Sequence, residues 1–565
     1  MKKVFFILAS VSFICSLVFS QNKLHPIWKI TGNTTDSIEV STIDSKNWKE
    51  INLLLSWERQ GYSWQDEHCA IVNHFKVGEN ERGLKLQFSL QADVKAVYVN
   101  NHKVGGDIPN SFWSERGKET LINIPDSVLK RDDENQLLFL LANLSYTGGV
   151  SHNICALVSD LESTESKVEL EFPTKDHVYL GDAAIRFVIR TQSQQSGQVE
   201  LIINDDFHKN WVNDTFNVEL GTKEIRVDAS KYNLVPGFYE CSAILDNGTY
   251  VGTAQWFAVN PEEIICTNKT IDGFDAYWQE ALSELKEIVP NFKMHRVDSL
   301  CSTTREGYVV EMSSLGNLII RGYYFVPKAD GKYPVVLHLP GYGYGFEHLN
   351  GFINREGNVA ELALCVRGHG ISNDVFNPWP EMTLWAVNCC SKDSNVYRSI
   401  YMDCVRAVDF LLSRPEIDTT KIGVAGGSQG GGLTLATAGL CQNTIAACAI
   451  FDPFLCDTRD QMKIRTIVKR ELESFTKYPE NNCNLNQILN VQDYIDTKGF
   501  TGKIKCPIYF AASLFDDDCP VRCGFSAFNE ISTVKSYEIF PSDSHLGESG
   551  QYDKLFYRLV EMLKK

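Results

Sequence analysis

The sequence predicts a multidomain chain in which an all-β N-terminal part is followed by an α/β C-terminal part. Three observations support this prediction. With 565 residues, the chain is long enough for about two to four domains. Between residues 30 and 260, short segments alternate between apolar and polar residues, as strands with one buried face do. After Pro261, helical segments alternate with extended apolar segments, which favours a mainly parallel sheet covered by helices.

The N-terminus has the pattern of a secretory signal peptide. Lys2 and Lys3 provide a basic start, and the nearly unbroken apolar run Val4–Phe19 follows. Ser20 is a small residue after which cleavage is expected. We therefore assign residues 1–20 to a signal peptide and expect the mature protein to be secreted or periplasmic. No later segment reaches the roughly 18 apolar residues of a membrane-spanning helix, so membrane insertion is not expected.

Charge and cysteine content exclude some classes of partner. The chain has 54 Lys and Arg against 71 Asp and Glu, a net charge of −17, and no block of basic residues. Nucleic acid is therefore not expected as a partner. The 17 cysteines follow neither a disulfide framework nor a zinc-binding spacing, and most are expected to be small buried hydrophobes. We expect no cofactor and no metal.

Residues 21–160 are expected to form the first β domain. Leu84–Leu90 alternates strictly between apolar and polar positions, and Val97–Gly105 has the pattern of two strands joined by a tight turn. Together with Asn52–Gly61, these stretches resemble the jelly-roll (galactose-binding-like) sugar-binding modules attached to many glycoside hydrolases. Three aromatic residues are candidates for stacking on sugar rings, with packing in the core or between domains as the simpler alternative. They are Trp64, Trp113 and Tyr146.

Residues 161–260 are expected to form a second β domain. Four short apolar segments follow one another at the spacing of strands in a β-sandwich. They are Val168–Phe172, Ile185–Ile189, Val199–Ile203 and Gly237–Leu245. About one hundred residues with this pattern predict an immunoglobulin-like sandwich, which we interpret as a spacer.

Residues 261–565 contain the alternation of helices and strands. Phe274–Leu285 and Tyr401–Leu411 have helical periodicity, whereas Pro334–Leu339 is a short apolar run typical of a buried strand. Another apolar run, Ile422–Ala425, leads into the turn Gly426-Gly427-Ser428-Gln429-Gly430 and then into a helical segment. A strand, a glycine-rich turn and a helix in this order form the setting of a nucleophile elbow.

Ser428 is the candidate nucleophile of this turn. In the motif Gly-x-Ser-x-Gly the serine stands on a strained turn, and side chains at Gly426 and Gly430 would collide with the strand and the helix. The motif alone is common, and a glycine-rich loop that merely packs a helix against a sheet is the alternative. The strand–turn–helix setting favours a nucleophilic serine in an α/β-hydrolase fold, in which the catalytic order is Ser, acid, His.

His545 is the predicted general base, because it is the only histidine after Ser428. The acid that orients its imidazole is expected on the loop that follows the apolar strand Ile508–Ala512. The candidates are Asp516, Asp517 and Asp518, which spacing does not distinguish, and less favoured Asp543. Two members of the consecutive trio are interpreted as solvated loop residues.

Two backbone N–H groups are expected to stabilise the charge that develops on the carbonyl oxygen, each contributing about 3 kcal/mol. The amide of Gln429, directly after the nucleophile, is one candidate. The glycine-rich segment Pro340–Gly345 follows an early strand and should supply the other, for which we choose the amide of Tyr342.

Residues 270–565, roughly half of the chain, resemble the acetyl xylan esterase/cephalosporin C deacetylase family of carbohydrate esterases. Besides the elbow, the matching stretches are Phe274-Asp275-x-x-Trp278, Arg367-Gly368-His369-Gly370, Tyr397–Asp403, Pro453–Asp457 and Asp516-x-x-Cys519-Pro520. The resemblance implies an α/β-hydrolase fold with Asp516 as the catalytic acid. It also implies a homo-oligomer, although the extra β domains leave the ring-like hexamer of the family open.

Three positions depart from the pattern of that family. Pro340 stands where the family usually has the His of His-Gly-Tyr, His369 where it has the Gln of Arg-Gly-Gln, and Leu546 where it has the Glu of His-Glu. None of them belongs to the predicted triad, so hydrolysis is expected to be retained. The departures bear on substrate preference and on the details of the pocket.

The preferred function is a secreted serine esterase that removes O-acetyl groups from plant polysaccharides or oligosaccharides. Ser428 would attack the acetyl carbonyl with His545 as base, and water would hydrolyse the acetyl-enzyme. A serine peptidase of the prolyl-oligopeptidase type shares the elbow, but the N-terminal half lacks the propeller repeat of roughly 40 to 50 residues. A carbohydrate-binding protein with an inactive hydrolase domain is the third alternative, against which the intact triad argues.

Overall fold

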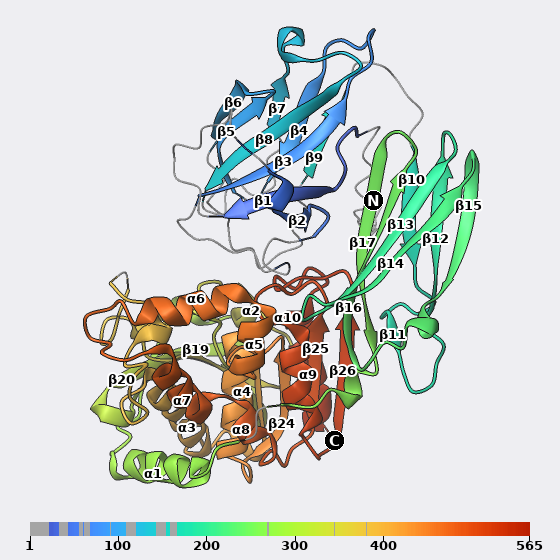
Figure 1. Cartoon of the computed structure of the whole chain (residues 1–565). Coiled ribbons are helices and arrows are strands. Elements are labelled where there is room, and N and C mark those ends of the chain that lie inside the picture. Colours follow the sequence, from blue (N-terminus) through green and yellow to red (C-terminus); the bar gives the residue numbers. More distant parts are fainter. Residues whose placement is uncertain are drawn as a thin grey trace, which may run out of the picture.

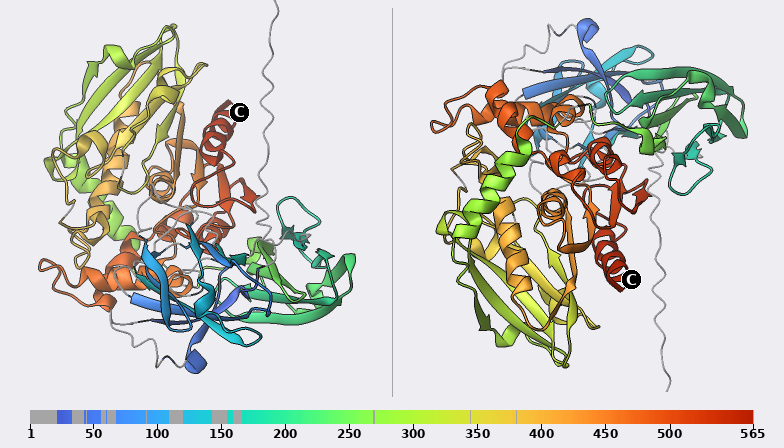
Figure 2. Two further views of the ribbon diagram at one scale, coloured as in Figure 1. Left: turned by 90° about the horizontal axis from the view of Figure 1, so that it is seen from above. Right: turned by 90° about the horizontal axis from the view of Figure 1, so that it is seen from below.

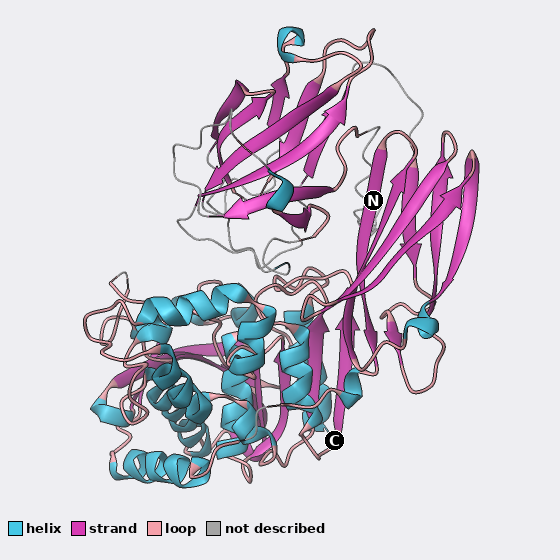
Figure 3. Cartoon of the chain, in the orientation of Figure 1, coloured by secondary structure: helices cyan, strands magenta, loops and turns pink. Residues whose placement is uncertain are grey.

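The computed structural model describes residues 22–32, 43, 45–55, 60, 68–90, 92–108, 120–142, 154–158, 166–267, 270–343, 345–379 and 381–564. The predicted signal peptide and the three sugar-stacking candidates, Trp64, Trp113 and Tyr146, lie outside these ranges. Two units built of strands precede a unit in which helices surround a sheet (Figure 1, Figure 3). We call them the first β unit (22–158), the second β unit (166–259) and the α/β unit (274–564).

The first β unit consists of two antiparallel sheets that share one apolar core. The larger sheet has the order β2 (Lys49–Asn52), β1 (Ile27–Gly32), β3 (His68–Lys76), β8 (Glu134–Ala142), β5 (Asp93–Val99) and β6 (His102–Ile108). The smaller sheet has the order β7 (Thr120–Asn123), β4 (Lys85–Ser89) and β9 (Ile154–Val158). Phe88 of the smaller sheet meets Phe139 of the larger one edge to face, with ring centroids 5.1 Å apart. The strand and hairpin predicted from residues 84–105 are β4 and the β5–β6 pair.

The second β unit also has two sheets around one core. One sheet has the order β10 (Lys167–Glu171), β12 (Arg186–Ser193) and β15 (Gly221–Asp228). The other has the order β11 (Val178–Tyr179), β17 (Tyr250–Val259), β16 (Gly237–Asp246), β13 (Gly197–Asp205) and β14 (Asn210–Val218). Ile189 from the first sheet and Leu201 from the second are both completely buried, because alternate residues of each strand face the partner sheet.

The α/β unit is built on one nine-stranded sheet. Its order is β18 (Lys293–Arg296), β19 (Arg305–Ser313), β20 (Ile319–Pro327), β22 (Ala360–Cys365), β21 (Tyr333–His338), β23 (Ile417–Gly427), β24 (Ile445–Phe451), β25 (Ile508–Ser513) and β26 (Lys535–Phe540). From β22 to β26 all neighbours are parallel, whereas β18, β19 and β20 extend the sheet in antiparallel fashion. The strands buried on both faces are the continuous apolar runs of the sequence.

Helices cover both faces of this sheet. They are α1 (Phe274–Glu287), α2 (Asn350–Ile353), α3 (Val396–Leu412), α4 (Gln429–Leu440), α5 (Thr458–Ile464), α6 (Thr466–Phe475), α7 (Leu485–Ile495), α8 (Lys498–Thr501), α9 (Val521–Asn529) and α10 (Gln551–Lys564). Leu559 of α10 packs with Ala425 and Ala449 on one face, whereas α3 and α4 pack with Val424 and Ile450 on the other. Within the described part of the chain, none of these helices combines the length and the apolar character needed to cross a membrane.

The second β unit packs directly against the α/β unit. Phe238 of β16 belongs to the same apolar cluster as the sheet of the α/β unit, and its ring lies 5.5 Å from that of Phe525 on α9. Nearby, Arg522 Nε donates a hydrogen bond of 2.7 Å to the buried carboxylate of Asp206. Two further views show both β units on the same side of the α/β unit (Figure 2). A shared core is not what the interpretation as a spacer predicts.

Candidate active site

Four neighbouring parallel strands end at one edge of the large sheet. Gly427, the last residue of β23, is in register with Phe451 at the end of β24, and Ser513 of β25 with Phe540 of β26. The first loop residues beyond these ends include all members of the predicted triad. The triad members are Ser428 after β23, Asp516 after β25 and His545 after β26, and Asp452 stands after β24. Carboxyl ends of parallel strands form the usual position of a site in such sheets.

The turn at Ser428 has the strained geometry of a nucleophile elbow. Ser428 has φ 57° and ψ −126°, a conformation that non-glycine residues rarely adopt. A Cβ atom on Gly426 would lie 2.5 Å from the backbone of Gly430, and one on Gly430 would lie 2.4 Å from the carbonyl oxygen of Leu339. The steric role predicted for the two glycines is therefore confirmed.

Phe451 lies between the nucleophile and the base. Its carbonyl oxygen accepts a hydrogen bond of 2.9 Å from the backbone N–H of Ser428. Its ring stacks on the imidazole of His545, with centroids 6.2 Å apart and planes at 24°. Ser428 and His545 are thus brought beside the same residue from strands β23 and β26, although 117 positions of sequence separate them, from 428 to 545.

The imidazole of His545 is held by one carboxylate of the predicted trio. Nδ1 of His545 lies 2.6 Å from Oδ2 of Asp516, which is completely buried. The other oxygen of Asp516 accepts hydrogen bonds from the amides of Asp518 at 2.7 Å and Cys519 at 2.8 Å. A carboxylate fixed in this way keeps the proton on Nδ1, so that in the neutral ring the lone pair lies on Nε2 and can accept the proton of a nucleophilic hydroxyl.

The other two carboxylates of the trio are not solvated, so that expectation is wrong. Asp517 is 4% exposed. Oδ2 of Asp518 lies 3.9 Å from Nε2 of His545, and its other oxygen lies 3.7 Å from the guanidinium of Arg465. Both nitrogens of the imidazole therefore have a carboxylate nearby, which spacing did not indicate.

Asp543 takes a different role from the one considered for it. Its carboxylate accepts hydrogen bonds from the backbone of Ser549 at 2.7 Å and from the side chain of Gln551 at 2.6 Å. These contacts fix the loop on which His545 stands.

Opposing effects set the charges of this cluster. Burial disfavours the imidazolium, but the carboxylates of Asp516 and Asp518 outweigh it and raise the pKa of His545 to about 9. Burial likewise opposes ionisation of Asp516, whereas His545 and a hydrogen bond from Asp452 lower its pKa below the ordinary value. Asp516 is therefore the charged partner of His545.

Asp452 is a member of the cluster that sequence reasoning missed. It is 1% exposed, and its carboxyl group accepts a hydrogen bond of 3.1 Å from the amide of Ser513. Burial and the neighbouring Asp516 raise the pKa of Asp452 well above its ordinary value, so it keeps its proton and can donate it to Asp516. The available signal was its position directly after an apolar strand between the elbow and the acid.

The loop after β21 is joined to the elbow by the side chain of Gln429. Its Nε2 donates to the carbonyl oxygens of Pro340 at 3.3 Å and Gly341 at 3.2 Å. The backbone N–H of Gln429 is the first of α4 and has no acceptor within the helix, so it is available to a bound oxyanion. Tyr342 lies in the same loop, where its hydroxyl accepts a hydrogen bond of 3.0 Å from the amide of Trp385. The amide of Tyr342 stays the predicted second donor.

The three departures from the family pattern lie around this site. Pro340 contributes the carbonyl oxygen bonded to Gln429, and His369 is completely buried between the loop and Gln429. Leu546, directly after His545, is 55% exposed.

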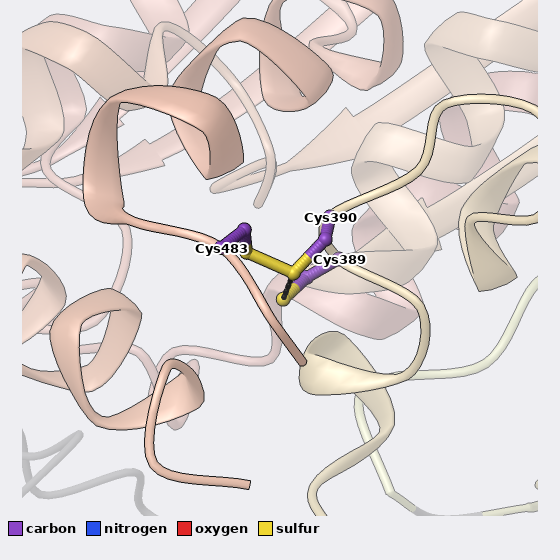
Figure 4. A group of neighbouring side chains, drawn as sticks. All are labelled: Cys389, Cys390 and Cys483. Carbon is purple, nitrogen blue, oxygen red and sulfur yellow. Dashed lines mark hydrogen bonds between the residues drawn. A yellow bond between two sulfur atoms is a disulfide. The ribbon is translucent and has the colours of Figure 1, made fainter. Parts of the chain in front are cut away.

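One disulfide was not predicted from the spacing of the cysteines. Cys390 and Cys483 are bonded, with Cα atoms 5.8 Å apart, and Sγ of Cys389 lies 3.9 Å from that of Cys390 (Figure 4). These three sulfurs form a group with metal-type donor atoms within 4.8 Å of one another, and Asp516, Cys519 and His545 form a second. In the first group, the sulfurs of Cys390 and Cys483 are joined in the disulfide. In the second, Asp516 and His545 are hydrogen-bonded to each other.

Comparison with known proteins points to one family. The family model described as acetyl xylan esterase (AXE1) matches residues 262–561. Acetyl esterase Axe7A of Xylanibacter ruminicola is 29% identical over 332 residues, which are 55% of this chain and 71% of that protein.

Solved structures of acetyl xylan esterases are also similar to the chain. The one from Paenibacillus sp. R4 is 25% identical with a TM-score of 0.48, and covers 53% of this chain and 98% of its own. The one from Thermoanaerobacterium sp. JW/SL YS485 is 24% identical with a TM-score of 0.47, and covers 54% of this chain and 97% of its own.

Proposed function

The chain belongs to the acetyl xylan esterase family, and we propose that Ser428, His545 and Asp516 remove O-acetyl groups from plant polysaccharides or oligosaccharides. As a member of this family it is a carboxylic ester hydrolase that acts on carbohydrate esters. The observation that carries the proposed mechanism is the 2.6 Å contact between His545 and Asp516 at the sheet edge where Ser428 stands on a strained turn. The family also favours an esterase over the peptidase and over an inactive binding protein.

The reaction proceeds through an acetyl-enzyme. Nε2 of neutral His545 takes the proton of Ser428 as Oγ attacks the acetyl carbonyl, and the backbone amides of Gln429 and Tyr342 stabilise the resulting oxyanion. The imidazolium, stabilised by Asp516, then returns the proton to the departing sugar oxygen, which leaves as a hydroxyl group. Water, deprotonated by His545, attacks the acetyl carbonyl, the bond to Oγ of Ser428 breaks, and the imidazolium returns the proton to Oγ; acetic acid leaves and ionises to acetate.

Aromatic side chains beside Ser428 support a preference for a small acyl group. The amide of Phe454 donates a hydrogen bond of 2.9 Å to the carbonyl oxygen of Ser428, so the backbone of Phe454 adjoins the elbow. The ring of Phe454 contacts Trp385 at a centroid distance of 5.0 Å and Tyr342 at 6.2 Å. We propose that these rings border the acyl-binding side of the site, which would favour acetate over longer chains such as butyrate.

The N-terminal part is proposed to bring the esterase to its substrate. In each unit, two sheets around one core support the proposed fold, a jelly-roll sugar-binding domain for residues 21–160 and an immunoglobulin-like sandwich for residues 161–260. Residues 1–20 would direct the chain to export, so that it meets acetylated polysaccharide outside the cytoplasm.

The serine is tested by substitution. Ser428→Ala is expected to abolish hydrolysis of an aryl acetate and release of acetate from acetylated xylan, because no other group attacks the carbonyl. Ser283→Ala, on the exposed face of α1, is the matched control and should keep the rate of the unchanged enzyme. A fluorophosphonate should label the unchanged enzyme at Ser428. Turnover by Ser428→Ala, or hydrolysis of a peptide p-nitroanilide in place of the acetate, would overturn the proposal.

A further inference from the structure

We propose that His369 is a positioning residue of the oxyanion hole, which ties the loop that carries Tyr342 to the first residue of α4. The inference rests on the proposed function, because it concerns the two backbone donors of that mechanism.

The imidazole of His369 contacts three different segments. Nε2 accepts a hydrogen bond of 3.2 Å from the backbone N–H of Gly343, the residue after Tyr342. The same nitrogen lies 2.9 Å from Nε2 of Gln429, the residue after the nucleophile. Nδ1 lies 3.1 Å from the carbonyl oxygen of Arg367. The ring is completely buried, so protein groups alone satisfy it.

These contacts allow only one tautomer of His369. The amide of Gly343 can only donate, so Nε2 must present its lone pair to it. The side chain of Gln429 is oriented independently, since its NH₂ group faces the carbonyl oxygens of Pro340 and Gly341 and its oxygen accepts from Tyr397 at 2.8 Å. The two hydrogens of its NH₂ group are therefore shared among three acceptors, the two carbonyl oxygens and the imidazole lone pair, and that lone pair also accepts from Gly343. The proton of His369 must then lie on Nδ1, where it is donated to a carbonyl oxygen.

The neutral ring is the stable form in this position. Burial lowers the pKa of His369 to about 4, so the lone pair on Nε2 is present at neutral and alkaline pH. The acceptor of its own proton is also fixed, because Arg367 binds Asp403 of α3 through two side-chain contacts of 2.7 and 2.9 Å and through its backbone amide at 3.0 Å. Through Asp403, α3 therefore fixes the position of Arg367, whose carbonyl oxygen accepts the hydrogen bond from the imidazole.

The tie acts on both proposed oxyanion donors. Tyr342 precedes the bonded Gly343, and the amide of Gln429 belongs to the residue whose side chain meets the ring. An oxyanion hole works only while its donors stay within hydrogen-bond distance of the developing charge. Without the lone pair of His369, the amide of Gly343 loses its acceptor, and only the bonds from Gln429 to Pro340 and Gly341 still hold the loop to the elbow.

The test compares substitutions that remove or keep the acceptor. His369→Leu fills the space without accepting a hydrogen bond, and we expect kcat for an aryl acetate to fall about 10²-fold while KM changes little. His369→Gln offers an amide oxygen in nearly the same place and should restore most of the rate. His177→Gln, which replaces another histidine bonded to a backbone carbonyl, is the matched control and should leave kcat unchanged.

Two further measurements separate positioning from general damage. The apparent pKa of His545 in the pH profile of His369→Leu should stay that of the unchanged enzyme, whereas affinity for a trifluoromethyl ketone should fall in parallel with kcat. Gln429→Met removes the contact with His369 from the side of the elbow, and it provides the test if His369→Leu does not fold. The double variant should be no slower than the slower single one.

The result that overturns the inference is a folded His369→Leu enzyme with the kcat of the unchanged protein. The inference is also overturned if the fall of kcat in His369→Leu comes with a shifted pH profile and a lower unfolding midpoint, and if His369→Gln does not restore the rate. If the proposed function itself fails, the unchanged enzyme has no esterase activity that depends on Ser428. The two failures are therefore distinguishable.

Discussion

Replacement of Asp516 by Asn changes one oxygen to an NH₂ group and reverses the hydrogen bond to His545. Oδ1 of Asp516 accepts from the amides of Asp518 and Cys519 at 2.7 and 2.8 Å. An NH₂ group cannot occupy that place, because it would face two other donors. The remaining oxygen of Asn must take it, and the NH₂ group then points at Nδ1 of His545, 2.6 Å from the replaced oxygen. Nδ1 becomes an acceptor, and the proton of the ring moves to Nε2.

The magnitude follows from that tautomer. A ring protonated on Nε2 cannot take the proton of Ser428, and the same change in serine hydrolases lowers kcat by about 10⁴-fold. This factor corresponds to about 5 kcal/mol of transition-state stabilisation. The two residues have the same shape, so the fold should be retained and KM should change little.

The assay is hydrolysis of p-nitrophenyl acetate from about pH 6 to about pH 10, with unfolding in urea as the check on the fold. Asp517→Asn is the matched control, because it makes the same substitution at a buried position of the same loop. It should stay within about threefold of the unchanged enzyme. If Asp516→Asn keeps more than about a tenth of kcat with an unchanged unfolding midpoint, the assignment of Asp516 as the orienting acid is refuted.

Two further predictions concern charge pairs. Asp518→Asn should move the rise of kcat/KM with pH to lower pH, because the mechanism needs neutral His545 and the lost carboxylate, 3.9 Å from Nε2, helps to raise its pKa to about 9. At high dielectric the Coulomb energy of about 1 kcal/mol gives a shift of about 0.8 unit, and a profile that does not move would contradict this reasoning. Asp206→Ala should lower the free energy of unfolding by about 3 kcal/mol, since it leaves Arg522 with a side chain only 15% exposed and without its carboxylate. Denaturation in urea measures the loss, and Glu561→Ala, at the exposed pair with Arg558 on α10, should change stability by less than about 1 kcal/mol.

The elements of the α/β unit were predictable because each has a local pattern. The helix predicted at Phe274–Leu285 is α1, and the elbow joins β23 to α4 as its glycines required. Ser428 and His545 could also be selected, one from a motif and the other because no other histidine follows it. Local pattern predicts what a segment forms by itself, and it also limits which residues can follow a strand.

The remaining features depend on contacts between distant residues. His369 and Gln429 are 60 positions apart, and the bonded Cys390 and Cys483 are 93 apart. No local sequence pattern predicts such a pair, because the two residues come into contact only once the sheet has formed. Asp518 was misjudged for the same reason. A polar loop residue is usually solvated, but in the folded chain this loop lies against the imidazole of His545, so that the carboxylate of Asp518 is close to the ring.

The core shared by Phe238 of the second β unit and Phe525 of the α/β unit bears on how the chain evolved. A module that touches its neighbour only through a linker can be lost, duplicated or exchanged without effect on the neighbour. A module that supplies part of the neighbour's apolar interior cannot, because its loss would expose that surface to water. Substitutions on the two sides of this boundary are therefore expected to be inherited together. The second β unit and the catalytic unit are therefore expected to form one heritable block.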